Sequence, residues 1–249
     1  MNYLPLEIID DDNSELIEKS IKNKKVKKIP NILEKYYSTD KIEIGLDEVG
    51  RGPLFGRVYT AAVILPKDDS FDHSKMKDSK KFSSKKKLIE TAEYIKENCI
   101  AWSINYEDEK VIDNINILQA TQQAMHKSIN NIIDKINITH SKINDNKDYL
   151  LLIDGNYFKP LINENIKYTH KCIEGGDNKY TSIAAASILA KVERDNYIKE
   201  LCDENIELIE KYSIDSNKGY GSKKHLDGIK QYGITQWHRK SFGICKQFK

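Results

Sequence analysis

Two adjacent carboxylates, Asp47 and Glu48, end an apolar run and stand directly before a glycine-rich turn that carries one arginine. Carboxylates are hard oxygen ligands that suit Mg²⁺ or Mn²⁺. Backbone N–H groups between glycines, as in the Gly-Arg-Gly turn at residues 50–52, can approach a sugar or a phosphate without hindrance from side chains. The pattern therefore indicates a metal site beside a phosphate site, which is the chemistry needed to hydrolyse a nucleic-acid backbone.

Hydrolysis of a phosphodiester by two metal ions requires several carboxylates from distant parts of the chain, with the ions roughly 4 Å apart. Four candidates stand out: Asp47, Glu48, Asp154 and Asp177. Asp47 and Asp154 would each end a strand, and neighbouring strands lie about 4.8 Å apart, within reach of shared ions. Because side chains alternate along a strand, a bend after Glu48 must turn this residue, or its carbonyl, toward the site. Taken alone, an aspartate at a strand end is more often a turn former.

The elements that must position these groups follow from the spacing of apolar residues. Strands are expected in five stretches: 42–47, 57–65, 100–106, 149–153 and 168–173. Amphipathic helices are expected in three: 83–99, 118–132 and 181–201. This order of elements predicts an α/β domain with a mixed sheet, flanked by helices, and a helical C-terminal lobe.

Residues 1–40 differ in texture from the rest of the chain, with an acidic run at 10–12 and a nearly continuous lysine run at 22–28. We expect an appended N-terminal extension, either a solvated helix and linker or a segment whose lysines contact nucleic acid. Residues 41–249 are expected to form one catalytic domain that includes the helical lobe at about 202–249.

Composition narrows the class of protein. Forty Lys+Arg against 38 Asp+Glu give a net charge of +2, so affinity for nucleic acid must come from local clusters. The four cysteines are widely separated and form no C-x-x-C pair, which argues against a zinc ribbon or a disulfide framework. No secretory signal or membrane span is visible in the sequence, so we expect a cytoplasmic protein, and a monomer.

Six sequence blocks resemble, in order, the motifs of type 2 ribonuclease H, the bacterial and archaeal ribonuclease HII group. The first block is DEVGRGPL at 47–54. The others are DSKK at 78–81, ILQAT at 117–121, LIDGN at 152–156, SIAAASILAK at 182–191 and HRKSF at 238–242. The resemblance spans about residue 41 to about residue 246, and six ordered blocks leave little room for coincidence.

The resemblance implies roles for further residues. The backbone of Gly50, Arg51 and Gly52 would read the ribose 2′-OH that separates RNA from DNA, and Arg51 would hold a phosphate. Without the family, such a turn is more often a plain hairpin loop. Tyr220 would stack on the sugar of the following deoxynucleotide. Asp177 is assigned as the fourth family carboxylate; its lead-in, Gly-Gly-Asp-Asn, departs from the usual pattern, and Asp195 is the alternative.

Other polar residues near these blocks have expected roles. Lysines that would contact phosphates, and so position a duplex, are Lys80, Lys81, Lys179, Lys191, Lys223 and Lys224. The run at 85–87 is expected to be a solvated helix start. Arg239 and Ser241 are expected to cover the same nucleic-acid strand. His225 and His238 are expected to make structural or phosphate-side hydrogen bonds and not to bind metal.

By resemblance, the protein is an endoribonuclease with a ribonuclease H-like mixed sheet and two Mg²⁺ or Mn²⁺ ions. It would cleave the RNA strand of RNA–DNA hybrids and nick ribonucleotide-containing duplex DNA 5′ to the ribonucleotide, giving 3′-OH and 5′-phosphate ends. One alternative is a ribonuclease HIII-like hybrid nuclease, although an extension of about 40 residues is short for the N-terminal domain of that group. A hybrid-binding module without catalysis would need a missing carboxylate, and a DNA-directed nuclease would have no use for a 2′-OH reader.

Overall fold

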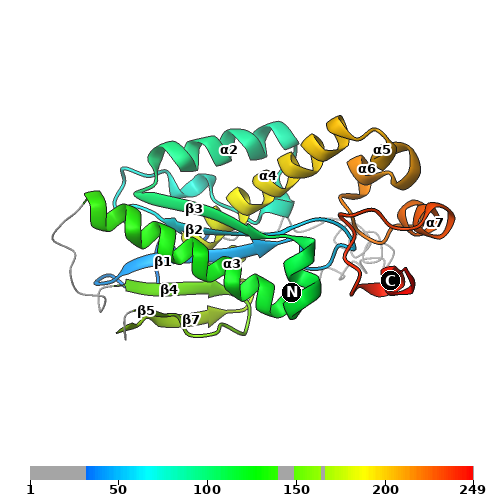
Figure 1. Ribbon diagram of the computed structural model, residues 1–249. Coiled ribbons are helices and arrows are strands. Elements are labelled where there is room, and N and C mark those ends of the chain that lie inside the picture. The colour runs from blue at the N-terminus through cyan, green and yellow to red at the C-terminus, as the bar shows by residue number, and fades with distance from the viewer. Residues whose placement is uncertain (1–31, 140–148, 164–165, 249) are drawn as a thin grey trace, which may run out of the picture. The chain divides into compact units, whose positions relative to one another are not determined.

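The computed structural model describes residues 32–139, 149–163 and 166–248. At the centre of this part of the chain is a five-stranded sheet with the strand order β3-β2-β1-β4-β7 (Figure 1). The strands are β1 (Ile42–Val49), β2 (Val58–Ile64), β3 (Ala101–Glu107), β4 (Tyr149–Asp154) and β7 (Thr169–Ile173). β1, β2 and β3 pair antiparallel, whereas β4 pairs parallel with both β1 and β7. The mixed sheet expected from the sequence is confirmed.

The helices of the described residues also follow the expected order. They are α2 (Lys85–Asn98), α3 (Glu109–Thr139), α4 (Thr181–Glu204), α5 (Glu207–Tyr212), α6 (Ile214–Asn217) and α7 (Lys223–Tyr232). Short 3-10 turns are η2 (His73–Lys75), η3 (Ser79–Lys81), η5 (Gly176–Asn178) and η6 (Gly243–Gln247). Two short antiparallel strands of two residues each, β5 (Ile162–Asn163) and β6 (Ile166–Lys167), were not expected.

Helix α3 consists of two helices joined at a kink: the predicted helix from Leu118 is the second, and the first, which begins at Glu109, was not expected. The backbone of Asn116 inside it is not helical, with φ of 67°. This kink shifts the apolar stripe between the two parts of the helix, so a single helical period fits only the later part.

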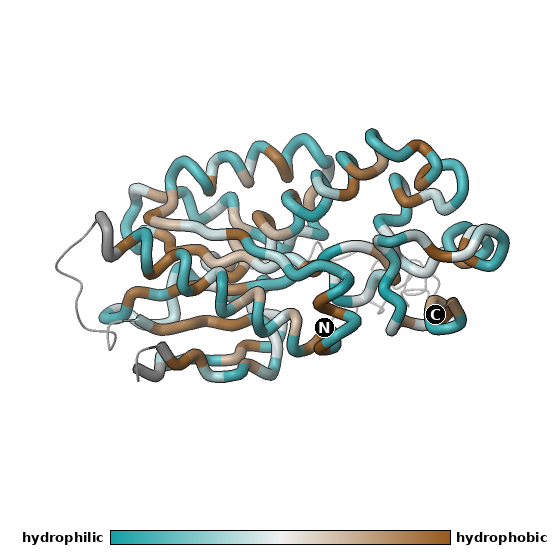
Figure 2. The backbone as a smooth tube through the Cα atoms, viewed as in Figure 1, coloured by the Kyte–Doolittle hydropathy of each residue, from teal (hydrophilic) through white to brown (hydrophobic). Residues whose placement is uncertain are grey.

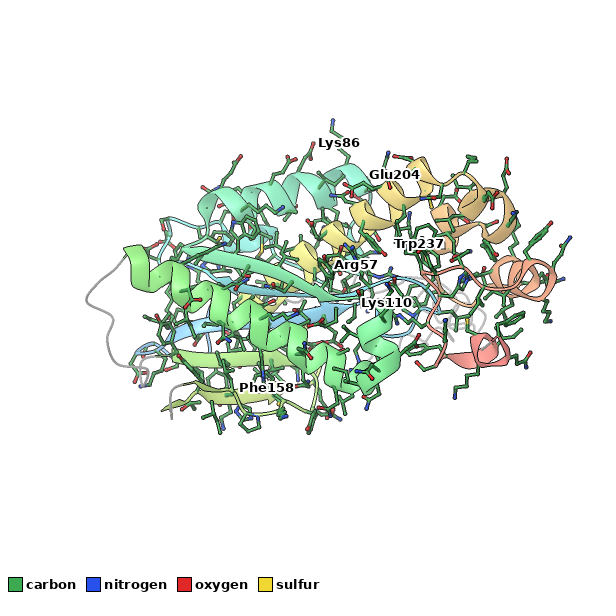
Figure 3. The ribbon with its side chains drawn as sticks, in the orientation of Figure 1. Arg57, Lys86, Lys110, Phe158, Glu204 and Trp237 are labelled. Carbon is green, nitrogen blue, oxygen red and sulfur yellow. The ribbon has the colours of Figure 1, made fainter. Side chains whose placement is uncertain are left out.

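Alternate residues of the strands enter two separate cores. On one face of the sheet, Ile44 and Leu46 of β1 pack with Met125 and Ile129 of α3. On the other face, β2 packs under α4, which is covered in turn by α2. The tube through the strands is correspondingly hydrophobic (Figure 2). In contrast, Lys86 on α2 points away from the domain (Figure 3), as expected for a solvated helix start.

Helix α4 approaches β1 closely because glycine and alanine form the contact. Gly45 lies against the backbone of α4, where a Cβ atom would stand 2.3 Å from the carbonyl carbon of Ser182. Residues 184–186 of α4, all alanines, are fully buried. A backbone contact of this kind fixes the height of α4 over the sheet, and with it the position of every side chain that α4 carries.

Residues 32–40, the last part of the predicted extension, are hydrogen-bonded to the start of α4. Glu34 N–H donates to Lys179 O (2.8 Å), and Glu34 O accepts from Thr181 N–H (3.0 Å). Residues 1–31 lie outside the described residues. At the other end, α5, α6, α7 and η6 form the helical lobe, which has its own apolar cluster around Phe55 and Tyr212. No helix in the described ranges is long and apolar enough to cross a membrane.

Replacing Gly45 by alanine should destabilise the fold, because the new methyl group would meet immovable backbone atoms of α4. Overpacking against backbone is expected to lower the free energy of unfolding by about 3 kcal/mol, which corresponds to roughly 6–12 °C in Tm for a domain of this size. Thermal unfolding followed by circular dichroism measures the change. Gly221→Ala is the matched control, since a Cβ atom there finds ordinary contacts of 3.7 Å and 3.8 Å. Equal Tm values for the two variants would contradict this packing.

Candidate active site

The parallel pairing of β1 and β4 brings two carboxylates to the same edge of the sheet. Leu46 pairs with Ile153, so the next residues in register, Asp47 and Asp154, lie side by side. Asp47 is only 5% exposed and accepts a hydrogen bond from the N–H of Glu48 (2.7 Å). The expected convergence of these strand ends is thus present in the structure.

Asp154 and Asp177 are linked through the turn after β7. Gly176, in η5, donates its N–H to Asp154 Oδ1 at 2.7 Å. A Cβ atom at Gly176 would stand 2.6 Å from the terminal methyl group of Ile183, so a larger residue here would require this side chain to move. Asp177 follows directly and accepts a hydrogen bond from Asn178 Nδ2 (2.9 Å).

All four predicted carboxylates line one cleft. The other lining residues are Val49, Gly50, Arg51, Gly52, Ser79, Lys80, Ser187, Lys191 and Tyr220. Asp195, the alternative to Asp177, does not line it and is instead paired with Lys191 (2.7 Å). The β1 strand continues through Val49, and the positive φ of Gly50 (93°) turns the chain after it. Both Asp47 and Glu48 line the cleft.

Burial and mutual repulsion shape the protonation of these groups. Burial, together with the negative charges of Glu48 and Asp154, raises the pKa of Asp47 well above its usual value. Burial also raises the pKa of Glu48, against the opposing effect of Arg51, whose Nη1 lies 3.3 Å from Glu48 Oε1. The pKa of Asp154 is raised by burial and by the charge of Asp177, against the Gly176 hydrogen bond. The cleft therefore needs positive charge to keep its carboxylates ionised.

The donor set fits divalent cations. Carboxylate oxygens are the ligands that Mg²⁺ and Mn²⁺ prefer. Within the part of the chain that the structure describes, no three acidic, histidine or cysteine side chains form a group that could hold an ion alone. Mg²⁺ commonly binds through one or two carboxylates and completes its shell with waters and substrate phosphates. An open arrangement of separated carboxylates suits that mode of binding.

The turn after β1, which we call the glycine loop (residues 50–56), is held from behind by the helical lobe. Leu54 N–H donates to Gly219 O and Gly56 N–H to Trp237 O, both at 2.8 Å. Arg239 is fully buried, and its guanidinium donates to carbonyls of the glycine loop. The expectation that Arg239 covers a nucleic-acid strand is therefore wrong: its side chain has no exposed surface to offer.

Tyr220 stands over the glycine loop with 48% of its surface exposed, and a Cβ atom on Gly52 would lie 3.6 Å from its ring. A pair of buried histidines holds its backbone. Thr235 N–H donates to His238 Nδ1 (2.9 Å), so His238 carries its proton on Nε2 and donates to His225 Nε2 (3.1 Å). His225 Nδ1–H in turn donates to Tyr220 O (2.9 Å). Both rings are neutral and structural, and neither lines the cleft.

The predicted lysines divide into two groups. Lys80 and Lys191 line the cleft, and the charge of Lys80 acts on Asp154. Lys179 is exposed and does not line it. Lys81 is nearby, because its Nζ donates to Asn178 Oδ1 beside Asp177.

Ser187 is a residue of the cleft that the sequence does not single out as a candidate. In the structure, hydrogen bonding from its hydroxyl lowers the pKa of Asp47, and its Oγ lies 3.1 Å from Ser79 Oγ. Its position could have been noticed in the sequence, because Ser187 is a polar residue directly after the alanine run 184–186 in an otherwise apolar stretch up to Ala190.

Comparisons with known proteins agree with this geometry. The family described as Ribonuclease HII matches residues 44–245. The Ribonuclease HII of Pelagibacter ubique is 46% identical over 202 residues, which cover 81% of this chain and 96% of that protein. The RNase HII of a PCNA complex from Archaeoglobus fulgidus has a TM-score of 0.60 at 22% identity and covers 82% of this chain and 96% of its own. Bst-RNase HIII in complex with Mn²⁺ has a TM-score of 0.56 at 16% identity, covering 77% and 70%.

The fold is thus that of the ribonucleases HII and HIII. Within this class, the chain belongs to the ribonuclease HII family. The resemblance of the six sequence blocks is confirmed.

In the absence of divalent ions, Asp47→Asn should raise the stability of the protein at pH 8. A carboxyl whose folded pKa is raised contributes stability below its unfolded pKa of about 4 and loses it as the pH rises. The neutral amide avoids the buried charge, so we expect a gain of about 1–2 kcal/mol, seen as a higher Tm. The gain should vanish near pH 4. A variant that is less stable than the wild type at pH 8 in EDTA would contradict this repulsion between the carboxylates.

The histidine pair should make the lobe sensitive to acid. Burial and the neighbouring His225 lower the pKa of His238 to about 3. Below about pH 6.5 this side chain is therefore protonated in the unfolded state and stays neutral in the folded state. Stability is therefore lost as the pH falls, by about 2 kcal/mol between pH 6.5 and pH 5 for this one group. Urea unfolding at several pH values should show a shallower loss for His238→Gln. Parallel pH profiles for the two proteins would refute the assignment.

Proposed function

We propose that this protein is an endoribonuclease that hydrolyses the RNA strand of RNA–DNA hybrids and nicks duplex DNA on the 5′ side of an embedded ribonucleotide. The observation that carries the proposal is the meeting of four carboxylates with the glycine loop and Tyr220 in one cleft. Membership of the ribonuclease HII family supports it. The ends produced would be a 3′-hydroxyl and a 5′-phosphate.

Asp47, Glu48, Asp154 and Asp177 would hold two divalent ions, Mg²⁺ or Mn²⁺. When bound, the ions supply the charge that lowers the pKa of a water and stabilises the departing oxygen. The raised pKa values of three of these carboxylates support this role, because bound cations remove the repulsion among them. A ribonuclease HIII of the same fold was solved with Mn²⁺.

The remaining groups of the cleft would bind and orient the substrate. Arg51, whose side chain is 47% exposed, can exchange its long contact with Glu48 for a phosphate oxygen. The backbone of Gly50, Arg51 and Gly52 would read the 2′-OH, and the Tyr220 ring, directly above Gly52, would stack on the next deoxyribose. The loop would require a 2′-OH on one nucleotide, and the Tyr220 ring would pack on the sugar of the next nucleotide, which carries none. The two contacts together favour cleavage at an RNA-to-DNA step.

Basic groups around the cleft would position the duplex through its phosphates. Lys80 and Lys191 line the cleft, and Lys81 lies beside it. Since phosphate contacts carry no sequence information, cleavage should depend on salt and not on the bases. Lys179, Lys223 and Lys224 lie outside the cleft lining, and contacts with more distant phosphates stay a prediction for them.

Cleavage of a duplex that contains one ribonucleotide tests the proposal. We expect a single nick 5′ to the ribonucleotide in Mg²⁺ or Mn²⁺, and a loss of at least about 10²- to 10³-fold in rate for Asp47→Asn or Asp154→Asn. Asp203→Asn is the matched control, because Asp203 pairs with Lys199, lies outside the cleft lining and should leave the rate within about threefold.

Other outcomes point elsewhere. Cleavage of long hybrids alone would favour a ribonuclease HIII-like activity. Tight binding of hybrid without cleavage would leave a hybrid-binding module and refute the catalytic assignment.

A further inference from the structure

The glycine loop is bound from its buried side by one guanidinium group. Arg239 Nη2 donates to Gly50 O (2.6 Å), and Nη1 donates to Arg51 O (3.0 Å) and Pro53 O (2.8 Å). Its Nε donates to Gly56 O (2.8 Å). Four N–H groups of a rigid, permanently charged fork thus take up four carbonyls of one seven-residue loop.

The direction of these carbonyls determines what the loop shows on its other side. The described chain has no cis peptide bond. In a trans peptide, the N–H of the next residue points opposite to the carbonyl. Because the carbonyls of Gly50 and Arg51 point to Arg239, the N–H groups of Arg51 and Gly52 point away from it.

That opposite side is the cleft. Gly50, Arg51 and Gly52 line it, whereas Arg239 does not and has no exposed surface. Among the residues that the structure describes, no carbonyl accepts a hydrogen bond from the N–H of Arg51 or Gly52. The N–H groups of Arg51 and Gly52 are therefore available as donors on the cleft side of the loop, while the carbonyls of Gly50 and Arg51 are bound to Arg239 on the other side.

We propose that Arg239 is a positioning residue for ribose recognition: by binding the carbonyls of Gly50 and Arg51, it directs the amides of Arg51 and Gly52 into the cleft as donors to the 2′-oxygen. The identity of the substrate in this inference rests on the proposed function, whereas the direction of the two amides does not. A phosphate oxygen could accept from the same donors; however, phosphates are present on DNA and RNA alike, so the two acceptors have different consequences for selectivity.

A second buried arginine provides a matched control. Arg194 is 1% exposed and donates to Lys218 O (2.9 Å), with longer hydrogen bonds to Phe55 O and Arg57 O (both 3.4 Å). Its side chain also packs against Gly50, where a Cβ atom would stand 2.4 Å from Arg194 Nε. It donates to neither the Gly50 nor the Arg51 carbonyl, however, and leaves both to Arg239. Arg194→Lys should therefore loosen the same region without changing the direction of the two amides.

Amide hydrogen exchange of the wild-type protein tests the geometry without any substrate. The amides of Arg51 and Gly52 should exchange within about tenfold of the free-peptide rate. The amides of Leu54 and Gly56, which have partners at 2.8 Å, should be protected at least about 100-fold. Protection of Arg51 and Gly52 equal to that of Leu54 would overturn the proposal, whether or not the protein is a nuclease.

Kinetics of Arg239→Lys test the consequence for recognition. A lysine ammonium is a compact point with three donors and cannot reach all four carbonyls. We expect KM for a one-ribonucleotide duplex to rise roughly tenfold, the weight of one lost hydrogen bond. The inhibition constant of an all-DNA duplex of the same sequence should stay within about twofold. Arg194→Lys should lower the Tm while it keeps the ratio of these two constants.

Several results would refute the proposal. Equal weakening of both duplexes by Arg239→Lys would assign the amides to phosphate. An equal loss of selectivity in Arg194→Lys would reduce the effect to general loosening of the loop. Failure of the wild-type protein to cut any ribonucleotide would refute the proposed function alone, and the exchange measurement would still decide the orientation of the amides.

Discussion

Repulsion between like charges at one edge of the sheet is the constraint on which the rest of the structure depends. The parallel register of β1 and β4 puts Asp47 beside Asp154, and Glu48 and Asp177 complete the group. A buried cluster of carboxylates is unfavourable on its own. Groups that the fold holds in place keep the carboxylates together: the backbone N–H of Gly176 and the hydroxyl of Ser187 donate to them, and β1 is buried on both faces.

The packing around the cluster follows from the same requirement. Helix α4 must lie close to β1 to bring Ser187 to Asp47, and Gly45 with the alanines 184–186 makes that distance attainable. Stability from the two apolar cores offsets the unfavourable charges. A site of this kind is built at a cost to stability, which the surrounding core covers.

Much of this arrangement could be predicted from the sequence because it is encoded locally. Apolar runs marked β1 and β4, glycines marked the turn, and the carboxylates stood at strand ends where parallel pairing joins them. The first part of α3, before Asn116, was not predicted because Asn116 breaks the helical period. Arg239 was misassigned because an arginine beside polar residues looks alike whether it is exposed or buried. Only the folded chain brings it to carbonyls 183–189 positions away.

That separation along the chain has a consequence for the timing of activity. The glycine loop is complete early in synthesis, but the guanidinium that holds it belongs to a residue made 189 positions later than Gly50. At about 5–20 residues per second, this interval is roughly 10–40 s on the ribosome. β4, β7 and Asp177 are made within this interval but before Arg239, so in its last part the sheet can fold around its carboxylates while the loop beside them still lacks its support. A nascent chain on the ribosome would therefore carry an unsupported glycine loop until Arg239 has been made.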